Sequence, residues 1–232
     1  MKAFLLAGGE GTRLRPLTDS IPKCLVPIKQ KALLEIWLQL CARSGISEVL
    51  INLHSHADAV RNFVADRDFG VQIRLFEEPR LLGSAGTIAA NRAWVQPDPY
   101  FWVFYADVLT NMDLSKMLRA HQEQNLAATL GAYQVPNPSQ CGVMNLDDDS
   151  IIRSFEEKPQ APKSDLAFSG VMIGTPDFLR EIPSVVPADI GFHVLPKLVG
   201  HMRAYVSNEY LIDIGTLEKY EMAQCTWPGL CP

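Results

Sequence analysis

The sequence lacks any long apolar run. None of its stretches approaches the roughly 20 consecutive apolar residues that a membrane-spanning helix needs. The apolar stretch within the opening MKAFLLAGGEG is also too short for a secretory signal peptide. We therefore predict a cytoplasmic protein with no membrane partner.

The sequence also lacks regularly spaced cysteines and any excess of basic over acidic residues. The five cysteines form no CxxC pair and no regular spacing, a pattern typical of reduced thiols rather than of disulfides. With 21 Lys and Arg against 26 Asp and Glu, the net charge is -5. Nucleic-acid binding usually requires a basic surface, so the composition argues against a nucleic-acid partner. Any anion site must then be a local cluster of Arg and Lys.

The opening loop also lacks the two most familiar nucleotide-binding motifs. A Walker A loop needs GxxxxGK followed by Ser or Thr, and no glycine here precedes such a lysine. A dinucleotide fingerprint needs GxGxxG, but Gly9, Gly11 and Leu14 occupy those places, so the third glycine is absent. Neither motif can explain this loop.

A phosphate-binding loop is nevertheless predicted from the residues that are present. The loop follows an apolar strand candidate at residues 2–7 and combines three glycines with three cations, namely Gly8, Gly9, Gly11, Arg13, Arg15 and Lys23. Glycine lets the backbone turn sharply and approach a ligand closely, and bare amides with nearby cations favour an anion. A glycine-rich turn with only a structural role would not explain the clustered cations. The pattern favours a polyphosphate.

The order of strand and helix patterns predicts an α/β fold. Helical patterns at 33–41 and 57–67 alternate with strand candidates in the first half of the chain, which indicates a largely parallel sheet with covering helices. From residue 127 the candidates become shorter, and polar turns and prolines separate them. The strand candidates after the opening loop are 48–53, 71–76, 101–106, 128–134, 142–146, 151–156 and 168–174. No linker is long enough to separate domains, and residues 226–232 read as an irregular tail.

Two aspartates follow strand candidates directly. Asp107 comes after the apolar run FWVFYA, and Asp213 lies in LIDIGT between an apolar strand end and a helix start. In open α/β sheets the carboxyl ends of strands form the ligand crevice. Either residue alone is more simply explained as a cap of the following turn or helix. Together with a polyphosphate loop, the pair predicts a magnesium ion held by carboxylates and substrate phosphates.

In this order the motifs resemble the sugar-phosphate nucleotidylyltransferase family. LLAGGEGTRLRPLT followed by PK is similar to the family's signature loop. LGSAGT, ADVL, CG, FEEKP, FSG and DIGT then follow in the family's order and extend the resemblance to about residue 224. The resemblance implies a single-domain, Rossmann-like fold of the GT-A type, with a mixed central sheet flanked by helices. That domain would span residues 1–225, with 1–125 mainly for the nucleotide and 126–225 mainly for the sugar phosphate.

The resemblance also implies a reaction. A nucleoside triphosphate and a sugar 1-phosphate would give a nucleotide sugar and pyrophosphate, with Mg²⁺ as cofactor. The motifs are most similar to guanylyltransferases for mannose or manno-heptose 1-phosphate, and a UTP- or dTTP-dependent enzyme is the alternative. A non-catalytic regulatory member is a rival of another class, although Arg13, Lys23, Asp107 and Asp213 are all present. The oligomeric state stays open, a homo-oligomer included.

The motif matches imply a role for individual residues. Arg13, Lys23 and Asp107 would be catalytic, and Asp107 and Asp213 would hold the metal. The nucleotide-binding set comprises Leu6, Ala7, Gly8, Gly9, Gly11, Thr12, Arg13, Lys23, Glu78, Gly83, Ser84 and Ala106. The sugar-phosphate set comprises Gly142, Glu157, Lys158, Ser169 and Gly170, with Glu157 on sugar hydroxyls and Lys158 on the phosphate.

The sequence departs from the family pattern in three places. Ala106 precedes Asp107 where the family often has glycine, and we expect the site to tolerate the added methyl group. Ser169 and Gly170 stand where the family often has Asn before Ala-Gly, which affects the expected hydroxyl contacts. The sequence ends near residue 232 without a left-handed β-helix domain, so no acyltransferase or acetyltransferase activity is expected.

Overall fold

The opening apolar stretch forms strand β1 (Lys2–Leu6) in the computed structural model, which describes residues 1–230. By its contacts the chain divides into two units. Unit 1 comprises Met1–Leu81, Phe104–Met112 and the chain from Glu209 onward, and unit 2 comprises Leu82–Val103 and Asp113–Asn208. Strand β6 (Phe101–Tyr105) crosses from unit 2 into unit 1.

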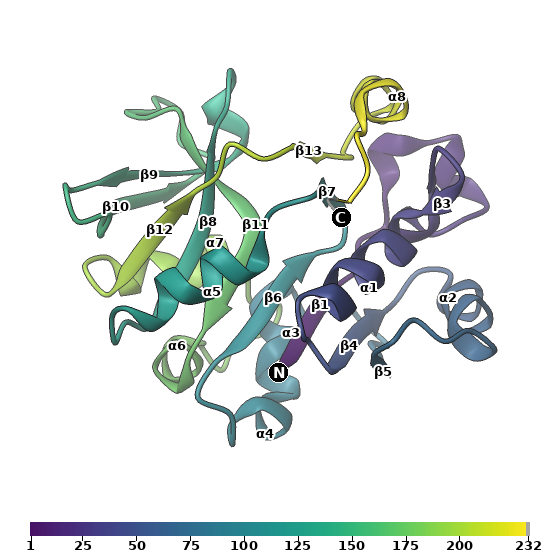
Figure 1. Ribbon diagram of the computed structural model, residues 1–232, viewed down its shortest axis with the longest axis horizontal. Helices are drawn as coiled ribbons and strands as arrows, with labels where there is room; N and C mark the ends of the chain where they lie inside the picture. Colours follow the sequence, from purple (N-terminus) through teal and green to yellow (C-terminus); the bar gives the residue numbers. More distant parts are fainter. Residues whose placement is uncertain (231–232) are drawn as a thin grey trace. The chain divides into compact units, whose positions relative to one another are not determined.

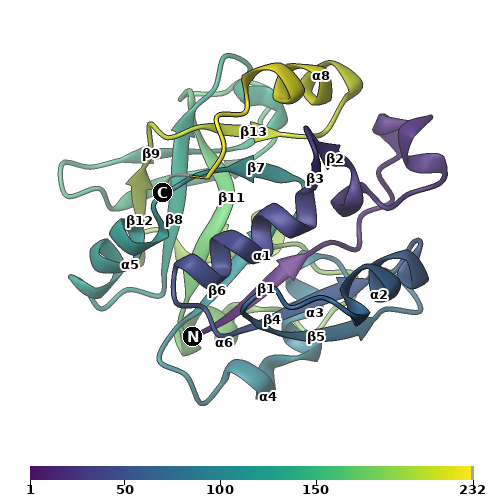
Figure 2. The same cartoon turned by 45° about the vertical axis from the view of Figure 1, so that its right-hand side comes forward.

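Unit 1 is built on parallel strands. Its remaining elements are β2 (Pro27–Ile28), β3 (Lys31–Ala32), α1 (Leu33–Arg43), β4 (Glu48–Leu53), α2 (Ala57–Ala65), β5 (Gln72–Glu77), β7 (Val108–Thr110), β13 (Leu211–Asp213) and α8 (Leu217–Thr226). β1 pairs with β4 and β4 with β5, both in parallel. Helix α1 runs alongside β1 (Figure 2) and buries Trp37, whose ring stacks on Phe104 at 4.7 Å between centroids. The unit therefore has its own apolar core.

Unit 2 is mainly antiparallel. It contains α3 (Ser84–Ala90), α4 (Arg92–Val95), α5 (Leu114–Gln122), β8 (Ala128–Gln134), β9 (Gly142–Leu146), β10 (Ile152–Glu157), β11 (Leu166–Gly174), α6 (Pro176–Glu181), α7 (Ile190–His193) and β12 (Met202–Val206). β11 pairs with β8 and β10 with β9 in antiparallel fashion, whereas β12 runs parallel to β8. Figure 1 shows these strands together with α5 and α7. Asp113 caps α5 by accepting a hydrogen bond from Lys116 N.

The predicted α/β class, with parallel and antiparallel strand pairs and flanking helices, is confirmed. Strands 48–53, 128–134 and 142–146 have the predicted bounds, but β7 and β12 were not predicted. The extent of the domain, 1–225, and its division at residue 125 stay predictions. Of the predicted tail, residue 226 ends α8, residues 227–230 form no regular element, and 231–232 lie outside the described residues. Within residues 1–230, no helix combines the length and apolarity needed to cross a membrane.

Candidate active site

The first part of the glycine loop is held by a buried asparagine. Asn52, in the apolar strand β4, accepts hydrogen bonds from Ala7 N at 2.6 Å and Gly8 N at 3.3 Å. Its amide nitrogen donates to Glu78 Oε1 at 3.0 Å, and both side chains are buried. A Cβ on Gly8 would lie 2.7 Å from that nitrogen, so this glycine leaves room for the asparagine. The sequence reading missed Asn52, although an asparagine inside the otherwise apolar run VLINL was a usable signal.

The second part of the loop turns at Gly11. Gly11 adopts φ +66°, and its carbonyl accepts hydrogen bonds from Thr18 Oγ1 at 2.7 Å and Leu14 N at 2.9 Å. This left-handed conformation favours glycine and closes the loop over Thr18. Gly9 has no atom within 4 Å of where a Cβ would stand and is exposed. The loop thus has a fixed base and an open tip, and Thr12 and Arg13 at its end are exposed as well.

Strands β7 and β13 bring the two predicted metal ligands together. In their antiparallel register Asp213 lies opposite Val108, and Ile214 N donates to Asp107 O at 2.8 Å. The predicted catalytic lysine contacts the first of these aspartates, because Lys23 Nζ lies 2.6 Å from Asp107 Oδ2. Lys219 Nζ approaches Asp213 Oδ2 at 3.4 Å. Ala106, just before Asp107, is buried and ties the end of β6 to β1 by donating to Leu6 O at 3.0 Å.

The guanidinium of Arg13 reaches the same corner of unit 1. A Cβ on Gly215 would lie 2.9 Å from Asp213 Oδ2 and 3.4 Å from Arg13 Nη2, so both groups border this glycine. Carboxylate oxygens are the ligands that Mg²⁺ prefers, and it usually completes its shell with substrate phosphates and water. Among residues 1–230 no group of three or more His, Cys, Asp or Glu side chains could hold a metal alone. Carboxylates on two paired segments therefore fit a magnesium ion that arrives with a phosphate substrate.

In unit 2, Gly83 and Ser84 are bound to the segment before α7. Gly83 has φ +79°, and a Cβ there would lie 2.3 Å from Ala188 O. That carbonyl accepts from Ala85 N at 2.9 Å and Gly86 N at 3.2 Å. Ser84 Oγ donates to Asp189 Oδ2 at 2.8 Å. The turn predicted to lie under the nucleotide thus has a structural role of its own.

Glu157 occupies a space that two glycines leave open. A Cβ added to Gly142 would lie 2.5 Å from Glu157 Oε2, and one added to Gly191 would lie 2.3 Å from the same oxygen. Gly142 is the register partner of Glu157 across β9 and β10, and Gly191 comes from α7. Burial and the nearby charge of Asp189 raise the pKa of Glu157, and Lys158 partly opposes that rise. The sequence reading missed Asp189 and Gly191, for which the sequence offers no comparable signal.

Two further members of the predicted sugar-phosphate set have unusual backbones. Lys158 adopts φ +51°, a strained value for a lysine, and its Nζ lies 3.9 Å from Glu157 Oε1. Gly170 has φ +76° where the register between β11 and β8 shifts. Ser169 is buried beside it, and its hydroxyl accepts from Val171 N at 3.2 Å. Backbone strain such as that at Lys158 often marks functional positions.

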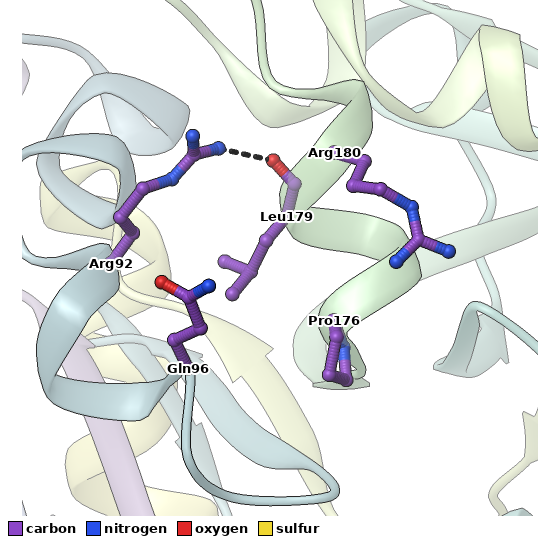
Figure 3. A pocket seen from close by; sticks show the side chains of 5 residues that line it. All are labelled: Arg92, Gln96, Pro176, Leu179 and Arg180. Atoms are coloured by element: carbon purple, nitrogen blue, oxygen red, sulfur yellow. Dashed lines mark hydrogen bonds between the residues drawn. The ribbon is translucent and has the colours of Figure 1, made fainter.

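A separate pocket of unit 2 lies between α4 and α6 (Figure 3). Arg92 Nη2 donates to Leu179 O at 2.6 Å, whereas the guanidinium of Arg180 points away from it and pairs with Asp177. Gln96 and Pro176 complete the lining. The two cations do not converge on one point, and none of the predicted site residues lines this pocket.

Comparison with known proteins identifies the family. A family model described as nucleotidyl transferase matches residues 2–227. The chain belongs to this family. The nucleotidyl transferase fold also recurs in the solved structure of HddC from Yersinia pseudotuberculosis, with a TM-score of 0.82 at 24% identity over 97% of this chain and 99% of that one. The resemblance inferred from the ordered motifs is therefore confirmed at the level of the family.

Relatives within the family differ in their nucleotides. A UTP–glucose-1-phosphate uridylyltransferase from Synechocystis sp. is 34% identical over 96% of this chain and 62% of its own length. A mannose-1-phosphate guanylyltransferase catalytic subunit beta from Drosophila pseudoobscura pseudoobscura is 30% identical over 97% of this chain and 62% of its own length. The chain thus spans about 62% of the length of these relatives.

The raised pKa of Glu157 predicts a pH-dependent stability for this nucleotidyl transferase. Because the folded state holds the proton more tightly than the unfolded chain, stability is favoured at low pH and falls as pH rises through the raised pKa. Glu157→Gln should therefore raise the free energy of unfolding at pH 7, and the gain should vanish near about pH 4, below the usual pKa of glutamate. Urea unfolding at both pH values measures this. Glu156→Gln, on the exposed neighbour, is the matched control and should give no such gain.

Proposed function

We propose that the chain transfers a nucleotidyl group from a nucleoside triphosphate to a sugar 1-phosphate. An oxygen of the sugar phosphate attacks the α-phosphorus, a new P–O bond forms, and the bond to the β-phosphate breaks. Its electron pair leaves with pyrophosphate. The observation that carries the proposal is the corner of unit 1 where β7 and β13 join Asp107 and Asp213 beside Lys23.

The groups of unit 1 supply charge for the triphosphate. Two anions must meet in this reaction, so a site gains mainly by neutralising charge and aligning the reacting groups. Opposite unit charges about 4 Å apart are worth about 4 kcal/mol at an effective dielectric of 20. Arg13 would hold the departing β- and γ-phosphates. Lys23 would leave Asp107 and bind the α-phosphate. The open amide at Gly9 would approach the nucleotide, whereas Gly8 N already donates to Asn52.

The same two aspartates would hold the magnesium ion. Asp107 and Asp213 are proposed as its protein ligands, together with oxygens of the substrate. When bound, the ion supplies positive charge that offsets the charge developing on the phosphates. Each lysine that now contacts a carboxylate, Lys23 or Lys219, would then be free to move onto a phosphate oxygen.

The groups of unit 2 fit the second substrate. The carboxylate of Glu157 can accept hydrogen bonds from sugar hydroxyls, and the ammonium of Lys158 can bind the sugar's phosphate. Both side chains lie at the end of β10, with Gly142 opposite. No side-chain nucleophile is required, because the sugar phosphate is itself the attacking group.

For the nucleotide and sugar, we propose GTP with mannose or manno-heptose 1-phosphate. The similarity of LGSAGT, ADVLT and YLIDIGT to that branch, and the relative from Drosophila, support this choice. UTP with a glucose-type phosphate is the second candidate, because the relative from Synechocystis is named for that pair. Cytoplasmic location stays a prediction.

A panel of nucleoside triphosphates against sugar 1-phosphates tests the proposal. We expect pyrophosphate release with GTP and a manno-configured phosphate to exceed that with UTP pairs by at least about tenfold in kcat/KM, because base-reading hydrogen bonds discriminate strongly. Equal or faster turnover with UTP and a glucose-type phosphate would reverse the choice of substrates. Absence of pyrophosphate release with every pair would reject the transfer activity itself.

A further inference from the structure

Phe192 presents an aromatic ring to solvent. Its exposed fraction is 54%, and among the Phe, Tyr and Trp side chains of residues 1–230 it is the one that is exposed. Single exposed apolar residues are common and need no explanation by themselves. The surroundings of Phe192 are what set it apart.

The backbone of Phe192 is fixed in unit 2. Its N–H donates to Asp189 Oδ1 at 3.0 Å, which caps the short helix α7. The preceding residue, Gly191, is buried and packs directly against Glu157. The ring is therefore carried on a segment that packs against the predicted sugar-binding carboxylate.

The ammonium of Lys158 connects that carboxylate to the ring. Its Nζ lies 3.9 Å from Glu157 Oε1 and 5.8 Å from the centroid of Phe192. The second distance is within the range of a cation–π contact. Lys158 itself has a left-handed backbone, at φ +51°. A carboxylate, a cation and an aromatic face thus adjoin one another within unit 2.

We propose that Phe192 is a specificity-determining residue whose ring packs against the apolar C–H face of the sugar in the sugar 1-phosphate. The inference rests on the proposed function and extends it to a residue that the motifs do not include. A pyranose offers hydroxyls at its edge, a phosphate at C1 and C–H groups on its faces. Glu157, Lys158 and Phe192 supply one complementary group for each of these.

The arrangement separates recognition of the sugar from recognition of its phosphate. Lys158 attracts any phosphate, whereas an aromatic face adds affinity only where an apolar surface covers it. Aromatic side chains with a few placed polar groups are typical of small-molecule sites. Phe192 should therefore distinguish a sugar 1-phosphate from inorganic phosphate, and Lys158 should not.

Steady-state kinetics of Phe192→Leu test this. We expect the KM for the sugar 1-phosphate to rise about tenfold, in line with the loss of a good aromatic contact. The kcat and the KM for the nucleotide should stay within about twofold, because the proposed partner of the ring is the C–H face of the sugar and not a reacting phosphate. Phe192→Tyr keeps the ring and should keep the wild-type KM. Competition by inorganic phosphate against the sugar 1-phosphate should be unchanged in Phe192→Leu and weakened in Lys158→Ala.

Phe63→Leu is the matched control. It removes the ring of another cation–aromatic pair, on α2 in unit 1, where Arg67 Cζ lies 4.3 Å from the ring centroid. Its KM values should equal those of the wild type. Thermal melting of all variants checks that the fold is intact.

The outcomes separate this inference from the proposed function. An inactive wild-type protein would reject the transfer activity and the role of Phe192 with it. An active wild type with an unchanged sugar-phosphate KM in Phe192→Leu would reject the role of Phe192 alone. The same holds if only the nucleotide KM changes, or if Phe192→Tyr loses as much as Phe192→Leu.

Discussion

Asp107→Asn is expected to lower magnesium-dependent pyrophosphate release by about 100-fold or more. The substitution keeps the shape of the side chain but removes the charge that would hold the metal and that now binds Lys23 at 2.6 Å. A bound metal stabilises the developing charge by several kcal/mol, and each 1.36 kcal/mol is a factor of ten in rate. The measurement is initial rate against magnesium concentration at saturating substrates.

The backbone should tolerate this substitution. Asp107 follows β6, and its carbonyl, which accepts from Ile214 N at 2.8 Å, is unchanged in the variant. Circular dichroism and the unfolding midpoint should therefore stay close to those of the wild type, since a partly exposed ion pair is worth about 1 kcal/mol at most.

Asp147→Asn provides the control for Asp107→Asn. Asp147 is also an aspartate with a basic partner at 2.6 Å, Arg153, but it lies in the turn between β9 and β10 of unit 2. Its loss should leave the magnesium dependence unchanged. Undiminished turnover in Asp107→Asn, or an equal loss in both variants, would reject the assignment of Asp107 as a metal ligand.

For the two aspartates, the sequence predicts the local position of each residue but not their proximity in the fold. Both follow apolar runs, so the sequence predicts that they lie at strand ends, because strand patterns and polar boundaries are local features. Their meeting depends on the pairing of β7 with β13, and β7 is only three residues long. A three-residue strand carries too little periodicity to be read. Pairing between segments so distant in sequence has no local signature at all.

The sugar-phosphate residues give the same lesson. Glu157 and Lys158 were predicted because FEEKP is a recognisable string at the end of a strand. Gly191 and Phe192 belong to a different segment and meet Glu157 and Lys158 only through the folding of unit 2. The opening glycine loop was predicted as a phosphate site from its composition, whereas the resemblance to the family alone assigned Gly83 to the nucleotide. For Gly83, the structure adds contacts that act within the fold itself.

Gly83→Ala is the variant with the largest expected effect on stability. With φ +79° and ψ 162°, Gly83 occupies a region that is essentially restricted to glycine. The added methyl group would stand 2.3 Å from the backbone oxygen of Ala188, which cannot rotate away as a side chain could. That oxygen accepts two hydrogen bonds, from Ala85 N and Gly86 N, which would be disturbed as well. Strain of about 1–3 kcal/mol and roughly 1 kcal/mol per hydrogen bond give an expected loss of about 3–5 kcal/mol.

Urea unfolding of Gly83→Ala beside Gly9→Ala measures this loss. Gly9 has no atom within 4 Å of the position of a Cβ, so its variant should change the free energy of unfolding by less than about 0.5 kcal/mol. A Gly83→Ala protein that cannot be purified in folded form agrees with the expectation if Gly9→Ala folds normally. If Gly83→Ala is instead as stable as the wild type, the turn must rearrange freely. Gly83 would then serve ligand binding, since the stability of the fold would not require a glycine there.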